Sequence, residues 1–337
     1  MAYKISLILL IIGTINACTN SKFKQEFDVQ RYSINKLQVI CDSIESVMPG
    51  EMYVSGDYLL WTDPINSDKF VHILDIETGK EIGKEAQRGE GPLEFISPKI
   101  EIMPNNKFYI YDLFSGRDAV FSIDSCVTGK NAILQTKINE IKDMTSFTFM
   151  GNEDMIVFCP SSKEPFTRTK QKQTFGKLPF KGDISNSYDH FQGIVKYNPL
   201  NGCLYYSTFK FPYFALYQKE DNFFKLKKEE LRTNEYKIKD NNLLYSGSKR
   251  GPIGVTLTSD YIVTIENDPK EEATDYFKIG RDLTKLPHTV CIYDYDLQLR
   301  KVINLGMPVV RLASSQKDNT LYFLGVNPDF ILYKIEL

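Results

Sequence analysis

The segment Arg88-Gly-Glu-Gly-Pro-Leu-Glu-Phe95 places one arginine and two glutamates within seven positions. Its glycines permit positive φ, and its proline fixes its own φ and favours extended geometry at the residue before it. A loop built in this way is rigid and can present Arg88, Glu90 and Glu94 to a polar ligand. It is not a phosphate-binding loop, because no Gly-Lys-Ser/Thr sequence follows.

A second segment, Lys249-Arg-Gly-Pro-Ile-Gly254, repeats the combination of a basic residue with glycine and proline. Arg250 from this segment and Arg117 complete the set of candidate ligand-binding residues. The alternative is structural, since glycine and proline also shape ordinary connections between strands and exposed charges are usually solvated.

No catalytic set is recognisable elsewhere, and we expect no catalytic residue, no metal and no cofactor. There is no Gly-x-Ser-x-Gly segment of the α/β-hydrolase type. The histidines lie about a hundred residues apart, without metal-site spacing: His72, His190 and His288. Several aspartates follow strand-like segments at regular intervals and are expected to cap turns: Asp63, Asp75, Asp112 and Asp124.

The first 17 residues predict a secretory signal peptide. Lys4 precedes a short apolar run, and Ala17 provides a small residue before the cleavage site. The run is shorter than the roughly 20 residues that a membrane-spanning helix needs. Cys18 directly after Ala17 resembles the lipobox cysteine of bacterial lipoproteins, so Cys18 is the expected lipidation site and residues 18–26 the expected tether.

Five cysteines remain after Cys18 in a chain that has six in all. They show no CxxC spacing, and their odd number leaves at least one thiol unpaired. Cys159 and Cys291 stand in strand-like segments and are expected to be small buried residues. The export signal also permits a disulfide.

After about residue 50 the sequence predicts short strands separated by turns. One pattern recurs, in which a strand ending in an aromatic residue and Asp is followed by a polar turn and a second strand. Its spacing is ~50 residues, which is typical of four-stranded propeller blades and gives about six of them. We therefore predict one all-β domain over 27–337, a six-bladed β-propeller of antiparallel blades. The segment 27–34 is the expected closing strand, because the hairpin at 320–335 supplies only part of a blade.

Two segments depart from this pattern. Residues 163–181 are rich in lysine, proline and glycine and predict a long surface loop. Residues 219–242 are heavily charged and are expected to form a solvated face, within which 223–231 could form one short helix.

The composition limits the possible partners. With 41 basic and 43 acidic residues the formal net charge is −2, which disfavours a nucleic-acid partner. Twenty tyrosines and 22 phenylalanines favour strands and provide side chains for sugar stacking or protein contacts.

The Gly-x-Gly-Pro-x-Glu-Phe segment, the repeated Tyr-x-x-Asp strands and the signal sequence together resemble the TolB-like six-bladed β-propeller lipoproteins of Gram-negative bacteria. Leu93 stands where that family more often has glycine. The resemblance implies a propeller on the periplasmic side or at the cell surface, and it brings no catalytic residues with it.

These observations predict a monomeric, non-catalytic binding module of the cell envelope, held at the membrane through its N-terminal lipid only. Its partner is expected to be an envelope protein or an extracellular glycan or peptide. The alternative is a polysaccharide-active lyase or hydrolase at the mouth of the propeller channel, built from Arg88, Glu90, Arg117 and Arg250. A purely structural role would be indicated by a broad exposed apolar patch.

Overall fold

The computed structural model describes residues 29–31, 37–65, 67–138, 143–151, 154–180, 182–267 and 282–337. The expected signal peptide, Cys18 and the expected tether lie outside these residues. Within the described part, no helix is both long and apolar enough to cross a membrane.

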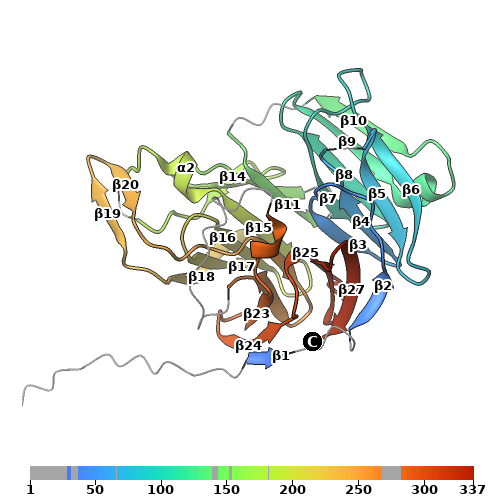
Figure 1. The fold of residues 1–337 in the computed structure, drawn as a ribbon. Coiled ribbons are helices and arrows are strands. Elements are labelled where there is room, and N and C mark those ends of the chain that lie inside the picture. Colours follow the sequence, from blue (N-terminus) through green and yellow to red (C-terminus); the bar gives the residue numbers. More distant parts are fainter. Residues whose placement is uncertain are drawn as a thin grey trace, which may run out of the picture.

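Six four-stranded antiparallel sheets follow one another around a ring, as predicted (Figure 1). The innermost strands of successive sheets are neighbours, and the last of them, β25, lies against the first, β3. The first three blades, each given from its innermost strand outward, are β3 (Met52–Ser55), β4 (Tyr58–Thr62), β5 (Lys69–Asp75) and β6 (Lys80–Gln87); β7 (Pro98–Met103), β8 (Lys107–Asp112), β9 (Arg117–Ser122) and β10 (Ile133–Ile138); and β11 (Ser146–Gly151), β12 (Asp154–Phe158), β13 (Phe166–Arg168) and β14 (Gln173–Phe175).

The remaining three blades have the same order. They are β15 (Gly193–Asn198), β16 (Cys203–Thr208), β17 (Tyr213–Glu220) and β18 (Phe223–Leu231); β21 (Gly254–Leu257), β22 (Tyr261–Ile265), β23 (Thr289–Asp294) and β24 (Leu299–Asn304); and β25 (Val309–Ser314), β26 (Thr320–Val326), β27 (Phe330–Glu336) and β2 (Gln38–Cys41). Short additional elements lie between strands: α1 (Ile123–Val127), α2 (Ser187–Phe191), the hairpin β19 (Tyr236–Lys239) with β20 (Asn242–Tyr245), and the 3₁₀ helix η2 (Leu283–Lys285).

An N-terminal strand closes the ring, but it is not the predicted segment 27–34. The outermost strand of blade six is β2, which pairs antiparallel with β27 and places Val39 opposite Tyr333 (Figure 1). The strand β1 (Val29–Arg31) instead pairs in parallel with β24, as a fifth strand of blade five. The connections give the reason. The outermost strand of each blade comes before the innermost strand of the next blade along the chain, and β2 stands in this position relative to β3.

The predictions of a loop and of a helix in the two unusual segments are wrong. Residues 163–181 contain β13 and β14, and residues 223–231 form strand β18 rather than a helix. In β18 the buried Phe224 lies between the exposed Phe223 and Lys225, which is the period of two of a half-buried strand. Because β18 is an outermost strand, its outward-facing charges protect an open sheet edge from further pairing.

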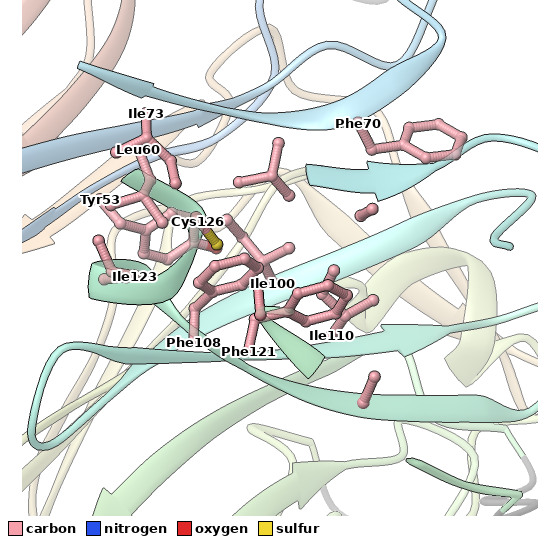
Figure 2. Close-up of a cluster of buried hydrophobic side chains, with 14 of the residues drawn as sticks. Tyr53, Leu60, Phe70, Ile73, Ile100, Phe108, Ile110, Phe121, Ile123 and Cys126 are labelled. Carbon is pink, nitrogen blue, oxygen red and sulfur yellow. The ribbon is translucent and has the colours of Figure 1, made fainter. Parts of the chain in front are cut away.

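Apolar side chains fill the space between neighbouring blades. Figure 2 shows the cluster between the first two blades, where Phe108 and Phe121 stack with their ring centroids 5.0 Å apart. Cys126 of α1 is buried in the same cluster. Cys41, Cys126 and Cys203 are free thiols; Cys291 is buried as expected, whereas Cys159 is only partly buried.

Candidate functional site

Two faces of the ring must be distinguished. We call the side that carries the connections between blades, such as residues 88–97, the loop face. The opposite side carries the turns between the first and second strands of the blades, such as 56–57 and 104–106, and we call it the hairpin face.

Arg88 lies on the loop face and is engaged by the chain itself. Its Nε donates to the carbonyl of Ser67 at 3.0 Å, and its Nη2 donates to that of Asp63 at 3.3 Å. The guanidinium also lies over the ring of Phe70, 4.0 Å from its centroid. Arg88 therefore joins the connection between β6 and β7 to the connection between β4 and β5.

Arg117 plays the same part in the second blade. Its Nη1 donates to the carbonyl of Gly91 at 2.5 Å and also to that of Glu94. The Glu94 carboxylate accepts the backbone N–H of Gly91 at 2.8 Å, which closes the turn, while Glu90 is exposed. The glycine- and proline-containing segment is thus held by hydrogen bonds from Arg117 and within its own turn.

Arg250 belongs to a different part of the ring, in the connection between the fourth and fifth blades. Its Nη1 donates to the carbonyl of Lys210 at 3.0 Å. All three arginines thus bind backbone carbonyls, and none of the five predicted ligand-binding residues lines either axial cavity described below. Ligand binding by these residues stays a prediction.

The expected role as turn caps is confirmed for Asp63, Asp75 and Asp112, whose carboxylates accept backbone N–H groups two or three residues further on. Asp124 instead lies in α1 and accepts the side-chain amide of Asn106. Asp112 makes a further bond. Its Oδ1 accepts the N–H of Phe114 at 2.8 Å, and its other oxygen accepts the N–H of Ile96. This fully buried carboxylate thereby joins two connections of the loop face. Exposed apolar side chains on these connections and on the one held by Arg88 form what we call the loop patch: Ile65, Leu93, Ile96, Leu113 and Phe114.

A hollow lies on the propeller axis, where the innermost strands meet. It has a volume of about 590 Å³ and is lined by the innermost strands of all six blades and by turns of the hairpin face. Its walls combine hydroxyl and amide groups, aromatic and apolar side chains, and five charged residues. The hydroxyl and amide groups belong to Ser55, Asn105, Asn106, Thr148, Thr256, Ser314 and Gln316, the aromatic and apolar groups include Tyr53, Phe149, Tyr197, Met103 and Met150, and the charged residues are Asp57, Glu101, Lys196, Lys317 and Asp318. Such a mixture of apolar surface and placed polar groups is typical of small-molecule sites.

A second, smaller hollow of about 80 Å³ lies toward the loop face, at the starts of the innermost strands. Tyr53, Glu101 and Lys196 line both hollows and therefore stand between them. We refer to the two spaces as the larger and the smaller axial cavity.

Between and around these cavities is an axial charge cluster, defined as Glu51, Tyr53, Lys99, Glu101, Lys196 and Arg311. Lys196 Nζ lies 2.6 Å from Glu101 Oε1 and 4.6 Å from the ring centroid of Tyr53. The hydroxyl of Tyr53 donates to the carboxylate of Glu51. These groups come to the axis from four innermost strands, β3, β7, β15 and β25; Glu51 stands directly before β3.

Burial and charge act in opposite directions on this cluster. Burial raises the pKa of Glu101 to about 7, against the lowering effect of Lys196. For Glu51, burial raises the pKa, but Lys196, Lys99 and the Tyr53 hydroxyl together hold it below its usual value. Burial lowers the pKa of Lys196, but the two glutamates raise it by more. The pKa of Tyr53 is raised well above its usual value by burial and by Glu51.

The sequence analysis did not select this cluster. Glu101 and Lys196 are 95 positions apart and stand singly between apolar residues of different strands. One signal in the sequence could have found it, namely a charged residue inside a segment predicted to be a buried strand. Such a charge is rarely buried without a partner, so it indicates a second charged group nearby in the fold.

The histidines have local roles. His72 Nδ1 lies 2.8 Å from Glu81 Oε2, and its ring stacks on Trp61 with centroids 4.8 Å apart. His190 Nδ1 lies 3.3 Å from the carbonyl of Asn186. Among the described residues, no group of three or more His, Cys, Asp or Glu is arranged to hold a metal ion.

Comparison with known proteins adds little to this geometry. No family model matches the sequence. No curated protein matches it either. Among solved structures, the Cps50 (Swd1) β-propeller domain of Myceliophteria thermophila matches 88% of this chain and 99% of that chain, with a TM-score of 0.48 and 9% sequence identity. At this identity the likeness concerns the fold alone.

The raised pKa of Glu101 predicts a specific pH dependence of stability. Between its usual pKa of 4.5 and its folded value of about 7, the folded protein keeps a proton that the unfolded chain releases. The stabilisation that protonated Glu101 adds to the free energy of unfolding is therefore fully present below pH 4.5 and is lost as the pH rises through 7. Relative to wild type, Glu101→Gln should gain unfolding free energy across this window, by at most about 3 kcal/mol.

Urea unfolding at a series of pH values measures this difference. Glu220→Gln is the control, because the Glu220 side chain is 59% exposed and should show no such trend. Parallel stability curves for wild type and Glu101→Gln would contradict the assignment.

Proposed function

We propose that this protein is a non-catalytic binding module that holds a carbohydrate in the larger axial cavity. The observation that carries the proposal is the lining of that cavity, in which hydroxyl and amide groups from several blades surround a space of about 590 Å³. Hydroxyl and amide groups exchange hydrogen bonds with sugar hydroxyls, and aromatic rings such as Phe149 offer faces for stacking.

The rival proposal, a lyase or hydrolase acting on polysaccharide, has less support. It requires Arg88, Glu90, Arg117 and Arg250 to act on one substrate. Arg88 and Glu90 lie in the connection between blades one and two, and Arg117 begins β9 of blade two, while Arg250 bonds to the backbone in the connection between blades four and five. The charges that do converge, at the axis, are engaged with one another.

Filling the larger cavity should abolish sugar binding. Thr256 lines this cavity and is only partly buried, so Thr256→Phe places a ring in the ligand space. Binding of the full chain to an oligosaccharide array should fall by roughly tenfold or more, since a displaced ligand loses several hydrogen bonds.

Leu134→Phe is the matched control, because Leu134 is 51% exposed on the outermost strand of blade two. Thermal unfolding of both variants checks that they fold, and Met150→Trp is a second variant that fills the same space. If the array shows sugar binding that neither cavity variant weakens, the cavity is not the site.

The membrane attachment is a separate part of the proposal and is supported by the sequence. A short apolar run after Lys4 and the Ala17–Cys18 pair favour a lipoprotein of the bacterial cell envelope, on the periplasmic side or at the cell surface. Cys18→Ala should move the protein from the membrane fraction to the soluble fraction after cell fractionation. Unchanged membrane association in this variant would argue against the lipid anchor.

A second candidate function is docking of a protein partner on the loop patch. Phe114 is 76% exposed, and the other four members of the patch are each at least 40% exposed. Exposed apolar groups gathered on one face favour protein contacts. Hydrogen bonds from Asp112, Arg88 and Arg117 hold the loops that carry them, so a partner would meet a preformed surface.

Photo-crosslinking in the intact envelope tests this docking surface. Phe114→Ser should remove the crosslinked partner while changing the free energy of unfolding by no more than about 0.5 kcal/mol, as is usual for an exposed position. The control is Phe223→Ser, because Phe223 is 64% exposed on β18, the outer strand of blade four. Loss of the same partner in both variants, or in neither, would contradict docking at the loop patch.

A further inference from the structure

The axial charge cluster contains more basic than acidic groups. Lys99, Lys196 and Arg311 supply three positive charges, against the carboxylates of Glu51 and Glu101. Since the pKa of Glu101 is about 7, its negative charge is only partly present at neutral pH. The axis therefore carries a net positive charge inside the protein.

Lys99 and Arg311 lie within electrostatic reach of Glu51, but their hydrogen bonds to the described residues go to uncharged carbonyl oxygens. Lys99 Nζ donates to the carbonyl of Thr145 at 2.5 Å. Arg311 donates to the carbonyls of Gly50 and Val310 at 2.9 and 2.8 Å. Buried or partly buried Lys and Arg side chains usually have a carboxylate or another anion beside them.

The smaller axial cavity lies at these cations. Lys99 and Lys196 both line it, and so does Thr145, whose buried hydroxyl has no hydrogen-bond partner in the part of the chain that the structure describes. Its volume of about 80 Å³ exceeds the roughly 10–15 Å³ that one water molecule needs, so a group of several heavy atoms fits. An unpartnered buried hydroxyl is costly unless something in the cavity bonds to it.

We propose that the smaller axial cavity binds the carboxylate of a small organic acid, between the ammonium groups of Lys99 and Lys196 and the hydroxyl of Thr145. Charge-assisted hydrogen bonds from the two lysines would hold the carboxylate, and Thr145 would donate to it. The site is distinct from the larger cavity, so it does not depend on the carbohydrate proposed there. The small volume selects acids of two or three carbons.

Acetate is the probe for this site. Calorimetric titration of the full chain, at constant ionic strength maintained with sodium chloride, should show saturable binding of acetate. Benzoate serves as a size control and should not bind. Equal binding of acetate and benzoate, or no saturable heat with acetate, would overturn the proposal.

Thr145→Val gives the sharpest test, because it removes only a hydroxyl that has no hydrogen-bond partner among the described residues and keeps the carbonyl that Lys99 uses. Acetate affinity should fall about fivefold with no loss of thermal stability. Lys99→Met should lower it by roughly tenfold or more, while the exposed Lys225→Met should leave it unchanged. Unchanged acetate affinity in both Thr145→Val and Lys99→Met would show that bound acetate sits elsewhere.

The pH dependence provides a readout that a merely structural role would not give. Glu101 is faced by Lys196 of β15, by Glu51 and by Tyr53 of β3, and it contributes negative charge to the cavity when ionised. Acetate stays ionised in this range, so its affinity should be higher at about pH 6 than at about pH 8. Glu101→Gln should remove this difference; a difference that persists in the variant would contradict the assigned arrangement.

Discussion

The ion pair between Lys196 and Glu101 is the interaction on which the centre of the molecule depends. Six innermost strands meet at the axis, and the pair stands where the larger cavity ends and the smaller one begins. A buried charge left without a partner is strongly destabilising, so loss of Lys196 would leave the Glu101 carboxylate in that state. The pair therefore stands between two different spaces, a larger one rich in hydroxyl and amide groups and a smaller one that Lys99 and Glu51 also line.

The connections of the loop face are held by hydrogen bonds between charged side chains and the backbone. Buried or partly buried charged side chains bond to the backbone of neighbouring connections, as Asp112 does with Ile96 and Phe114. Connections without regular secondary structure are thereby held in one shape, and apolar side chains can remain exposed on them. The two ends of the propeller thus offer a recessed polar space and a preformed apolar surface, which suit different kinds of partner.

Much of the fold could be predicted because its signals are local. The spacing from Asp63 to Asp112 gives the blade period. The aromatic-rich segments that end at these residues were predicted to be strands, and the structure shows them as β4 and β8. The failures also have local causes: the charges of 223–231 concealed the period of two around Phe224, and the closing strand was placed too early. The axial cluster could not be predicted, because its members come from separate blades and only closure of the ring brings them together.

The most direct test of this account is a crystal structure of the protein soaked with a mixed library of oligosaccharides and peptides. The account predicts density for an oligosaccharide in the larger axial cavity, in contact with side chains such as Thr256 and Phe149. Density only on the loop face, beside Arg88 and Glu90, with both axial cavities empty, would contradict it. That result would return the binding site to the segment 88–95.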